Sequence, residues 1–467
     1  MNRISCYVNF KENLNKNLPY YDLLIRQING SGQDAEPWCG EHAILCSGTQ
    51  SKTVSKICEG YQFTIVFLGY IHSPFTLKNK LLRFGYHFFT DDHAEIVLTA
   101  YIHYGEDFIK QISGEFSLII YDSMRRQIFA TQDSHATSVL FYSNIDDFWV
   151  LSSSVTGFFA HPKIPKKVSG ACVLELICVQ NRISKNIFEN INILKPGEIL
   201  KITANKAETK FVNDLQSSPK EPILSGENQS RGIIFSDDPE SHSLLKSLCK
   251  TQTKRHNLVD VYAEKAPESA CALSARLHKI PTDHSSVLEG LSASVDALGI
   301  PFLTAYDLII ARTIKSVTKE NCELFFSMPD RSLPKKSYLC NLLENNAFTS
   351  GIKNNMESFS SSADIFLPYP KLIGSHFDRT IKTPFATENA CSLGVFEDIH
   401  TKKILRRILL DIISKEYPPI TAFFRKEALL KLCEGGFRFF HGQSENELIS
   451  YLIKLNLWFE KFRPQII

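Results

Sequence analysis

The segment Ser236-Asp237-Asp238-Pro239-Glu240-Ser241 concentrates carboxyl and hydroxyl groups between a short apolar run, RGIIFS, and a helix-forming stretch, PESHSLLKSLCK. Carboxylate oxygens are ligands that Mg²⁺ prefers, so Asp237, Asp238 and Glu240 could together hold this ion. Asp and Ser at the start of a helix also accept hydrogen bonds from its free backbone N–H groups, which explains the same residues without a ligand. The residues alone leave both interpretations open.

Cysteine is the other reactive residue type, with twelve copies in the chain. No two cysteines have C-x-x-C spacing, and no cysteine–histidine cluster has the spacing of a zinc finger. Cys172, Cys178 and Cys433 lie inside apolar stretches. This placement predicts reduced side chains in the core of a cytosolic protein.

Length and composition indicate a folded protein of two domains, because 467 residues exceed what one compact core usually holds. Hydrophobic residues make up 43% and charged residues 22%, which is ordinary for globular proteins. The net charge of +2 does not favour nucleic acid or an anionic membrane as a partner. The basic cluster of Lys402, Lys403, Arg406 and Arg407 is predicted to be a solvated helix face.

The N-terminal stretch MNRISCYVNFKEN has the pattern of a strand, and it lacks the charged-then-apolar pattern of a signal peptide. No run approaches the roughly 18 consecutive apolar residues of a membrane span. We therefore expect a soluble, cytoplasmic protein.

Short apolar runs between turn signals make residues 1 to 205 rich in strands. Two helices are predicted among them, in TLKNKLLRFG and AEIVLTAYIHYG, and each stops at a glycine. The order of strands, then two helices, then more strands fits a layered α+β domain better than a parallel βαβ array. The predicted strands are ISCYVNF, FTIVFLGYI, GEFSLIIYD, QIFATQD, SVLFYSN, FWVLSSS and GEILKIT.

A stretch rich in Ser, Pro, Asn and Gly, NDLQSSPKEPILSGENQSRG, predicts a linker over residues 213–231 between domains at 1–212 and 232–467. In the second domain, strands in RGIIFS and NLVDVYA alternate with helices in PESHSLLKSLCK and residues 268–278. This alternation indicates a parallel α/β sheet. After Leu291 the predicted elements are mostly helices, in TAYDLIIARTIKSV, KKILRRILLDIIS and ENELISYLIKLNLWFEKF.

Several segments, in one order along nearly the whole chain, resemble the asparagine synthetase family. LRFGYHFFTDDHAEIVLTAYIHYGEDFIKQISGEFSLIIYD parallels the family's acidic motif and its Gly-x-Phe-Ala-x-x-x-x-Asp strand. MNRISCYVNF stands where the family begins with Met-Cys-Gly-Ile, FLGYIHS stands for Asn-Gly-Glu-Ile-Tyr-Asn, and GIIFSDDPESHSLLKSL stands at the pyrophosphate loop. The resemblance implies an N-terminal Ntn-hydrolase-like αββα sandwich of the class II glutamine amidotransferase type. It implies that an α/β parallel-sheet synthetase-like domain of the ATP-pyrophosphatase type follows, with a helical C-terminal part.

The resemblance also implies which residues stand at the glutaminase positions. The family's catalytic N-terminal cysteine falls on Asn2, whose amide is no nucleophile, and Cys6 lies inside a strand where it has no free amine. The oxyanion-hole asparagine falls on Leu68, which cannot donate a hydrogen bond, beside a retained Gly69. The acid that would hold the substrate amine falls on or near His93. We therefore expect no glutaminase activity.

At the pyrophosphate loop the family has Ser-Gly-Gly-x-Asp-Ser, where this chain retains Ser236 and Ser241 and places Glu240 at the acidic position. Asp237 and Asp238 replace the glycines that let the backbone approach phosphate. Two carboxylates beside a polyanion repel it by several kcal/mol at an effective dielectric near 20, against the ~8 kcal/mol of a micromolar site. ATP binding in the family's geometry is therefore not expected, unless Mg²⁺ lies between the loop and the phosphates.

The family's second nucleotide motif falls on FFSMPDRSLPKK, where Ser327 and Asp330 could match but the glycines are missing. Lys403 is the candidate for a family lysine ahead of a Leu-Arg pair. No cofactor is therefore expected, except ATP and Mg²⁺ if the acidic loop has been rebuilt around the ion.

Two functions remain open from this resemblance. The first is a non-catalytic member of the family that partners an active ligase, or presents a peptide substrate, in an amide-forming pathway. The second is an ATP-dependent amide ligase or cyclase, in the manner of beta-lactam synthetases and lasso-peptide cyclases, which also lack the N-terminal cysteine.

Overall fold

The computed structural model describes most of the chain as two compact units, each treated separately below. The first comprises chiefly Met1–Lys166 and Lys185–Pro219, and the second chiefly Lys220–Asp364 and Tyr369–Ile467. The described residues are 3–29, 36–49, 51–133, 139–168, 182–183, 188–211, 230–235, 239–250, 259–263, 275–301, 306–317, 322–326, 342, 345, 347–349, 365–366, 381–382, 399–437, 439 and 445–466.

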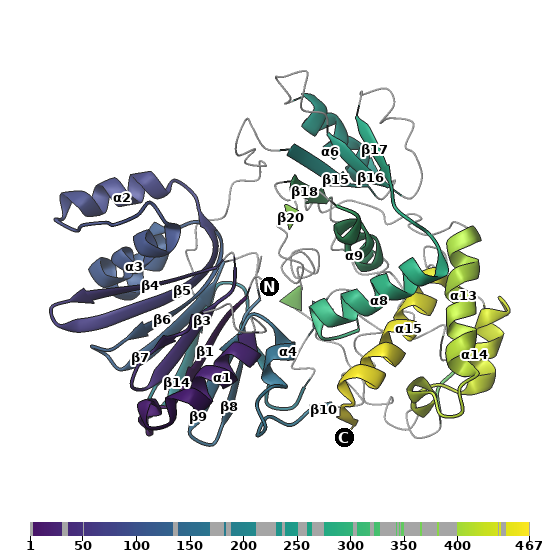
Figure 1. Ribbon diagram of the computed structural model, residues 1–467, viewed down its shortest axis with the longest axis horizontal. Helices are drawn as coiled ribbons and strands as arrows, with labels where there is room; N and C mark the ends of the chain where they lie inside the picture. The colour runs from purple at the N-terminus through teal and green to yellow at the C-terminus, as the bar shows by residue number, and fades with distance from the viewer. Residues whose placement is uncertain are drawn as a thin grey trace. The chain divides into compact units, whose positions relative to one another are not determined.

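Two antiparallel sheets of six strands form the centre of the first unit (Figure 1). The strands of the first sheet, in spatial order, are β12 (Asn192–Ile193), β8 (Phe141–Ile145), β9 (Phe148–Ser152), β1 (Ile4–Val8), β3 (Ala43–Ser47) and β2 (Trp38–Cys39). Those of the second are β14 (Ala207–Phe211), β13 (Glu198–Thr203), β7 (Gln127–Gln132), β6 (Gly114–Asp122), β5 (Tyr61–Ile71) and β4 (Lys52–Cys58).

An apolar layer between these sheets and a second one under the helices hold the unit together. Alternate residues of β1 and β5, such as Cys6 and Leu68, point into the layer between the sheets, because successive side chains of a strand face opposite ways. The other residues of β5, such as Phe67, pack under α3 (His93–Tyr104). The order helix, sheet, sheet, helix confirms the expected αββα sandwich.

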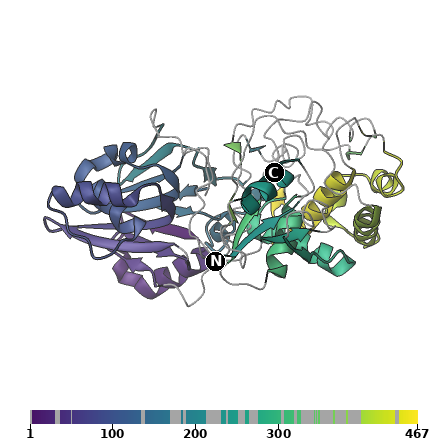
Figure 2. The same ribbon diagram turned by 90° about the horizontal axis from the view of Figure 1, so that it is seen from above.

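Helices cover the outer face of each sheet (Figures 1 and 2). α3 and the neighbouring α2 (Pro74–Arg83) lie on the second sheet, and the predicted stop of α3 is confirmed, since Gly105 follows it with φ of 60°. α1 (Leu18–Asn29) lies on the first sheet and was not predicted, although Tyr21, Leu24, Ile25 and Ile28 have helical spacing and are buried. The remaining elements are η1 (Leu14–Asn17), η2 (Gly105–Gln111) and α4 (Val155–Phe158).

The second unit contains a five-stranded parallel sheet. Its spatial order is β17 (Arg276–Lys279), β16 (Asp260–Ala263), β15 (Ser230–Ile234), β18 (Cys322–Phe326) and β20 (Ile381–Lys382). β15 is followed in sequence by α6 (Pro239–Lys250), as predicted. β15 starts inside the predicted linker, whose residues 213–229 lie outside the described part.

One predicted helix, over residues 268–278, is wrong at its C-terminal end. Arg276–Lys279 form strand β17 instead, and residues 268–274 lie outside the described part. The Nε2 atom of His278 lies 2.8 Å from Asp260 Oδ1, and its ring stacks on Tyr262 with centroids 4.8 Å apart. These contacts with β16 hold the segment in an extended conformation.

Helices α8 (His284–Leu298), α9 (Tyr306–Ser316), α13 (Ile399–Ile413), α14 (Lys426–Cys433) and α15 (Glu445–Phe462) form the rest of the second unit, with η3 (Pro419–Ala422). A short parallel pair joins β10 (Lys167–Val168) to β21 (Gln465–Ile466). Lys167–Ser184 thus groups with the second unit although the sequence places it before residue 212. β11 (Arg182–Ile183) and β19 (Ile365–Phe366) are further short strands.

A buried ion pair ties α9 to α15. Lys454 Nζ lies 2.7 Å from Asp307 Oδ2, and the two side chains are 1% and 0% exposed. Burial raises the pKa of Asp307 and lowers that of Lys454, while the attraction between them opposes both changes. One turn further along α15, Trp458 donates a hydrogen bond of 2.8 Å to the backbone oxygen of Gly299. These two contacts fix the register of α15 against the neighbouring helices.

Removing one charge of this pair should destabilise the second unit strongly. We expect Lys454→Met to lower the free energy of unfolding by about 3–5 kcal/mol, because it leaves the Asp307 carboxylate buried without its cationic partner. Asp307→Leu combined with Lys454→Met should recover much of that loss. The measurement is urea unfolding followed by circular dichroism.

Lys415→Met is the matched control: its partner Glu460 is also on α15, but Lys415 is 53% exposed, so the cost should stay below about 1 kcal/mol. Equal losses in both single variants would contradict this account.

Candidate functional site

Three of the glutaminase positions, Leu68, Gly69 and His93, lie at or next to one end of β5. Leu68 is 5% exposed and packs in the apolar layer between the two sheets. Gly69 follows with φ of 108°, and a Cβ there would overlap the backbone oxygen of Glu115 on β6. The glycine is therefore required by the close approach of the two strands. Asn2 lies outside the described residues.

Cys6 is the cysteine nearest in sequence to the family's catalytic position. Its side chain is fully buried in β1 within the same apolar layer as Leu68. Burial raises the pKa of the Cys6 thiol far above its ordinary value. A thiol attacks as its thiolate, so this environment suppresses nucleophilic chemistry. The prediction that Cys6 is a core residue is confirmed.

His93 is the first residue of α3 and contacts Ile71, the last residue of β5. Its Nδ1 atom accepts a hydrogen bond of 2.9 Å from the backbone N–H of Ile71. Burial lowers the pKa of His93, and the nearby Asp92 carboxylate opposes this effect only in part. The acceptor role of Nδ1 requires that atom to carry no proton. His93 therefore fixes the strand end as a neutral group and presents no carboxylate to an amine.

Polar side chains replace the apolar layer beyond Leu68. Tyr70 and Glu115 are register partners on β5 and β6, and the phenol of Tyr70 has its pKa raised by burial and then by Glu115. The His72 ring makes an edge contact with Tyr70 at 5.5 Å, and burial lowers its pKa. This end thus carries a neutral imidazole and a protonated phenol. The protonated phenol of Tyr70 is a poor nucleophile at neutral pH.

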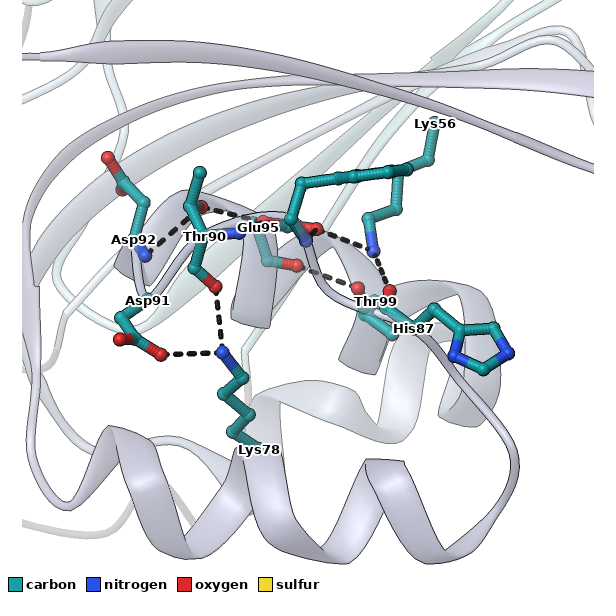
Figure 3. Close-up of polar contacts among 9 residues, drawn as sticks. Lys56, Lys78, His87, Thr90, Asp91, Asp92, Glu95 and Thr99 are labelled. Carbon is teal, nitrogen blue, oxygen red and sulfur yellow. Dashed lines mark hydrogen bonds and ion pairs between the residues drawn. The ribbon is translucent and has the colours of Figure 1, made fainter.

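A network centred on Glu95 holds the loop between α2 and α3 next to His93 (Figure 3). The Glu95 side chain accepts hydrogen bonds of 2.9 and 2.8 Å from the backbone N–H groups of Phe89 and Thr90. Lys56 of β4 lies 2.9 Å from the same carboxylate and donates a bond of 2.8 Å to the backbone oxygen of His87. The sequence analysis did not identify Glu95 or Lys56 as important.

The Glu95 carboxylate stays ionised in spite of its burial. Desolvation would raise its pKa, but hydrogen bonds from Thr90, Phe89 and Lys56 together lower it to about 2. The signal in the sequence is Asp92-x-x-Glu95, a helix-capping residue followed by an acid three positions later. Asp92 does cap α3, since it accepts from the N–H of Ala94 at 3.0 Å.

The predicted nucleotide site falls largely outside the described residues. Ser236, Asp237, Asp238, Ser327 and Asp330 all lie there, as does the side chain of Glu240, so their grouping, including the proposed Mg²⁺ ligands, stays a prediction. Ser241 is the last residue of the pyrophosphate-loop motif and the one member of that motif whose side chain the structure describes; it is fully buried in α6.

The strands that precede the two predicted motifs are well placed for a ligand site. β15 ends at Ile234 and β18 at Phe326, and these two residues are register partners in parallel strands. In the sheet, β16 and then β17 lie on one side of β15, whereas β18 lies on its other side. The direction in which successive strands are added therefore reverses at β15. In open α/β sheets, ligands bind outside the carboxyl ends of the strands at such a reversal.

Lys403 lies on the exposed side of α13, whereas its neighbour Lys402 pairs with Glu445 of α15 at 2.7 Å. In the part of the chain that the structure describes, no group of three or more His, Cys, Asp or Glu side chains is placed to hold a metal ion. None of the helices described there has the length and apolar character needed to cross a membrane.

The pKa of Glu95 makes stability depend on pH. Because the pKa falls from about 4.5 to about 2 on folding, its contribution is present above pH 4.5 and is lost as the pH falls towards 2, about 3 kcal/mol in full. We expect Glu95→Gln to lower the free energy of unfolding at pH 7 by about 2–3 kcal/mol and to flatten its decline between pH 5 and 3. Thermal unfolding across this range measures both.

Asp91→Asn, at a 68% exposed carboxylate of the same loop, is the control and should cost below about 1 kcal/mol. An unchanged pH slope in Glu95→Gln would refute the assignment.

Comparisons with known proteins indicate a glutamine amidotransferase domain in this chain. Residues 53–212 match the glutamine amidotransferase domain family. The chain is 24% identical over 208 residues to "Asparagine synthetase [glutamine-hydrolyzing] 3" of Bacillus subtilis (strain 168), covering 42% of the chain and 34% of that protein. It is 26% identical over 166 residues to "Asparagine synthetase [glutamine-hydrolyzing] 2" of the same strain, covering 34% and 22%. It is 28% identical over 142 residues to "Amidase chry2" of Gibberella zeae, covering 28% and 21%. The chain thus spans about a third or less of the length of these relatives.

Two solved structures are also similar at low scores. One is titled "Structure of the allosteric regulatory enzyme of purine biosynthesis", with a TM-score of 0.33 and 14% identity over 59% of this chain and 64% of that one. The other is a glutamine phosphoribosylpyrophosphate amidotransferase from B. subtilis, with a TM-score of 0.32 and 12% identity over 82% and 90%. These matches show that residues 53–212 belong to the glutamine amidotransferase domain family and that the chain is similar in sequence to asparagine synthetases.

Proposed function

We propose that this chain acts by binding, as a non-catalytic partner subunit of an amide-forming biosynthetic pathway, and that it does not hydrolyse glutamine. The observation that carries the proposal is the Leu68 side chain, which is 5% exposed in the apolar layer between the sheets. The resemblance places the oxyanion-hole donor at this position. The side chain stabilises the fold there and offers no hydrogen bond.

Physical magnitudes support the loss of glutaminase chemistry. Removal of one oxyanion donor alone costs about 10²–10³-fold in rate. The resemblance places Asn2 at the nucleophile position, and Cys6 cannot replace the missing thiol because it is buried and hard to ionise. His93 accepts a backbone hydrogen bond at the position of the acid that would hold the substrate amine. The catalytic groups are therefore replaced by residues that serve the fold.

The second unit supports a related proposal, a synthetase-like domain whose nucleotide site has decayed. Its strand order and its predicted motifs after β15 and β18 fit the place where such domains bind ligands. Asp237 and Asp238 stand where glycines would admit phosphate. Electrostatic repulsion from these two aspartates favours a domain that does not bind ATP.

The alternative is an ATP-dependent amide ligase or cyclase in which Mg²⁺ bridges this acidic loop and the phosphates. It is favoured by the same strand order, because β15 and β18 end side by side just before the two motifs. Glu240 would add a third carboxylate to the ion. The two proposals differ in whether MgATP binds.

The first test is ammonia release from glutamine. We expect none above a buffer blank, because the nucleophile and the oxyanion donor are both replaced. A glutamine-hydrolysing asparagine synthetase assayed in parallel provides the positive control. Ammonia release that disappeared in Cys6→Ser would overturn the proposal.

The second test is thermal stabilisation by MgATP. A ligand at about a hundred times its Kd stabilises by ~2.7 kcal/mol, so binding would be seen easily. We expect no shift for the natural chain at millimolar MgATP, and a gain for Asp237→Gly with Asp238→Gly, which removes the repulsion. The ligase alternative makes the opposite claim: the natural chain should bind MgATP and lose it in Asp237→Ala.

A further inference from the structure

The last residue of β5, Ile71, is held in place by an imidazole. Its backbone N–H donates a hydrogen bond of 2.9 Å to Nδ1 of His93, the first residue of α3. An imidazole nitrogen accepts a hydrogen bond only when it carries no proton. A protonated His93 would direct a second N–H at the N–H of Ile71. This contact between strand and helix therefore requires His93 to be neutral.

His72, the next residue along the chain, carries a second partly buried imidazole. Its backbone N–H donates a hydrogen bond of 2.7 Å to the backbone oxygen of Ser113, and its ring makes an edge contact with Tyr70. The Nε2 atom of His72 is shielded from solvent and has no hydrogen-bond partner among the residues that the structure describes. A positive charge on this ring would lack the hydration that water gives it, so the fold favours the neutral form.

The electrostatic surroundings agree with this geometry. Burial lowers the pKa of both imidazoles; Asp92 opposes the effect at His93, and Glu115 of β6 opposes it at His72, each only in part. The phenol of Tyr70, which faces His72, is protonated and uncharged, because burial and then Glu115 raise its pKa. His93 also lies at the N-terminus of α3, where the helix dipole disfavours a cation.

Four other charged groups at this end of α3 form pairs with one another. Glu95 of α3 binds Lys56 of β4 at 2.9 Å, and Asp91 pairs with Lys78 of α2 (Figure 3). Both pairs join the loop before α3 to its neighbours. Their charges compensate each other, so they change the balance at the two imidazoles little.

The chain that follows His72 is strained. Ser73 has φ of 51°, in the left-handed region that residues other than glycine rarely adopt. Ser73 is the N-cap of α2, yet its side chain makes no capping hydrogen bond. Release of Ile71 and His72 would let this residue relax. The junction between β5 and α2 is therefore a place where the first unit can open locally.

We propose that His72 and His93 form an acid-sensitive latch that joins the end of β5 to β6 and α3. Both imidazoles are neutral in the closed form, and their protonation releases the end of β5 and the start of α2. Leu68 and Gly69, to which the resemblance assigns part of the glutaminase site, lie just before the latch. Acid would thus loosen this end of the first unit. The latch goes beyond the proposed function and does not depend on it.

The direction of the effect follows from linkage. In the open form each imidazole recovers its ordinary pKa of about 6.5, whereas in the closed form the pKa is lower. The closed form is therefore fully stable above about pH 6.5 and loses stability as the pH falls below that value. From pH 7 to pH 5.5, each histidine should raise the opening constant by up to about eightfold, and the two together by up to about seventyfold.

Hydrogen–deuterium exchange of the full chain measures this opening. We expect the peptide of residues 68–76 to lose protection by more than about tenfold between pH 7 and pH 5.5, after correction for the pH dependence of exchange in an unfolded chain. The central strand β7 of the same sheet should keep its protection. This difference would separate local opening from unfolding of the whole unit.

Two substitutions remove the titrating groups and preserve the contacts. His93→Asn supplies an amide oxygen that can accept from Ile71, and His72→Phe keeps a ring against Tyr70. Each should remove one step of up to about eightfold from the acid response, and the double variant should show none. His87→Gln, which removes an exposed imidazole from the loop between α2 and α3, is the matched control and should respond as the natural chain does.

Circular dichroism at both pH values verifies that each variant is folded, and the comparison of the natural chain at the two pH values stands without them. Three outcomes overturn the proposal: equal protection of residues 68–76 at pH 7 and pH 5.5, an equal loss of protection in β7, or a full acid response in the double variant.

Discussion

The apolar layer between the two six-stranded sheets is the constraint on which the first unit depends. β1 and β5 contribute alternate side chains to it, including Cys6 and Leu68. The same two strands lead to the positions where the family holds its nucleophile and its oxyanion donor. In this chain the layer extends to Leu68, whose apolar side chain occupies the position to which the resemblance assigns the oxyanion donor.

The sequence was informative where local rules agree with the fold. α3 has an apolar face, a capping Asp92 and a terminal Gly105, and it was predicted closely. Glu95 was overlooked because its role depends on backbone N–H groups of a loop and on Lys56 from another strand. Such a network combines a local capping pattern with a contact distant in sequence, and only the first half is visible in the residues.

Two further differences concern α1 and β17. α1 was missed although its buried residues have helical spacing, and β17 was predicted as the end of a helix. β17 is short, and its residues are mostly exposed, so neither alternation nor a buried run marks it as a strand. Pairing with β16 and the contact of His278 with Asp260 decide its conformation. Of the candidate nucleotide site, the sequence predicted the position after β15, and the sheet order adds β18 as its neighbour.

The short parallel pair of β10 with β21 has a consequence for how the polypeptide is made. Lys167–Val168 are synthesised long before Gln465–Ile466, yet they form one ladder in the second unit. During translation, Lys167–Val168 cannot pair with Gln465–Ile466 until nearly three hundred further residues have left the ribosome. The second unit therefore contains its full set of strands only when residues 167–168 and residues 465–466 have both been synthesised. This ladder is therefore a long-range contact, which can form only after nearly the whole second unit has been synthesised.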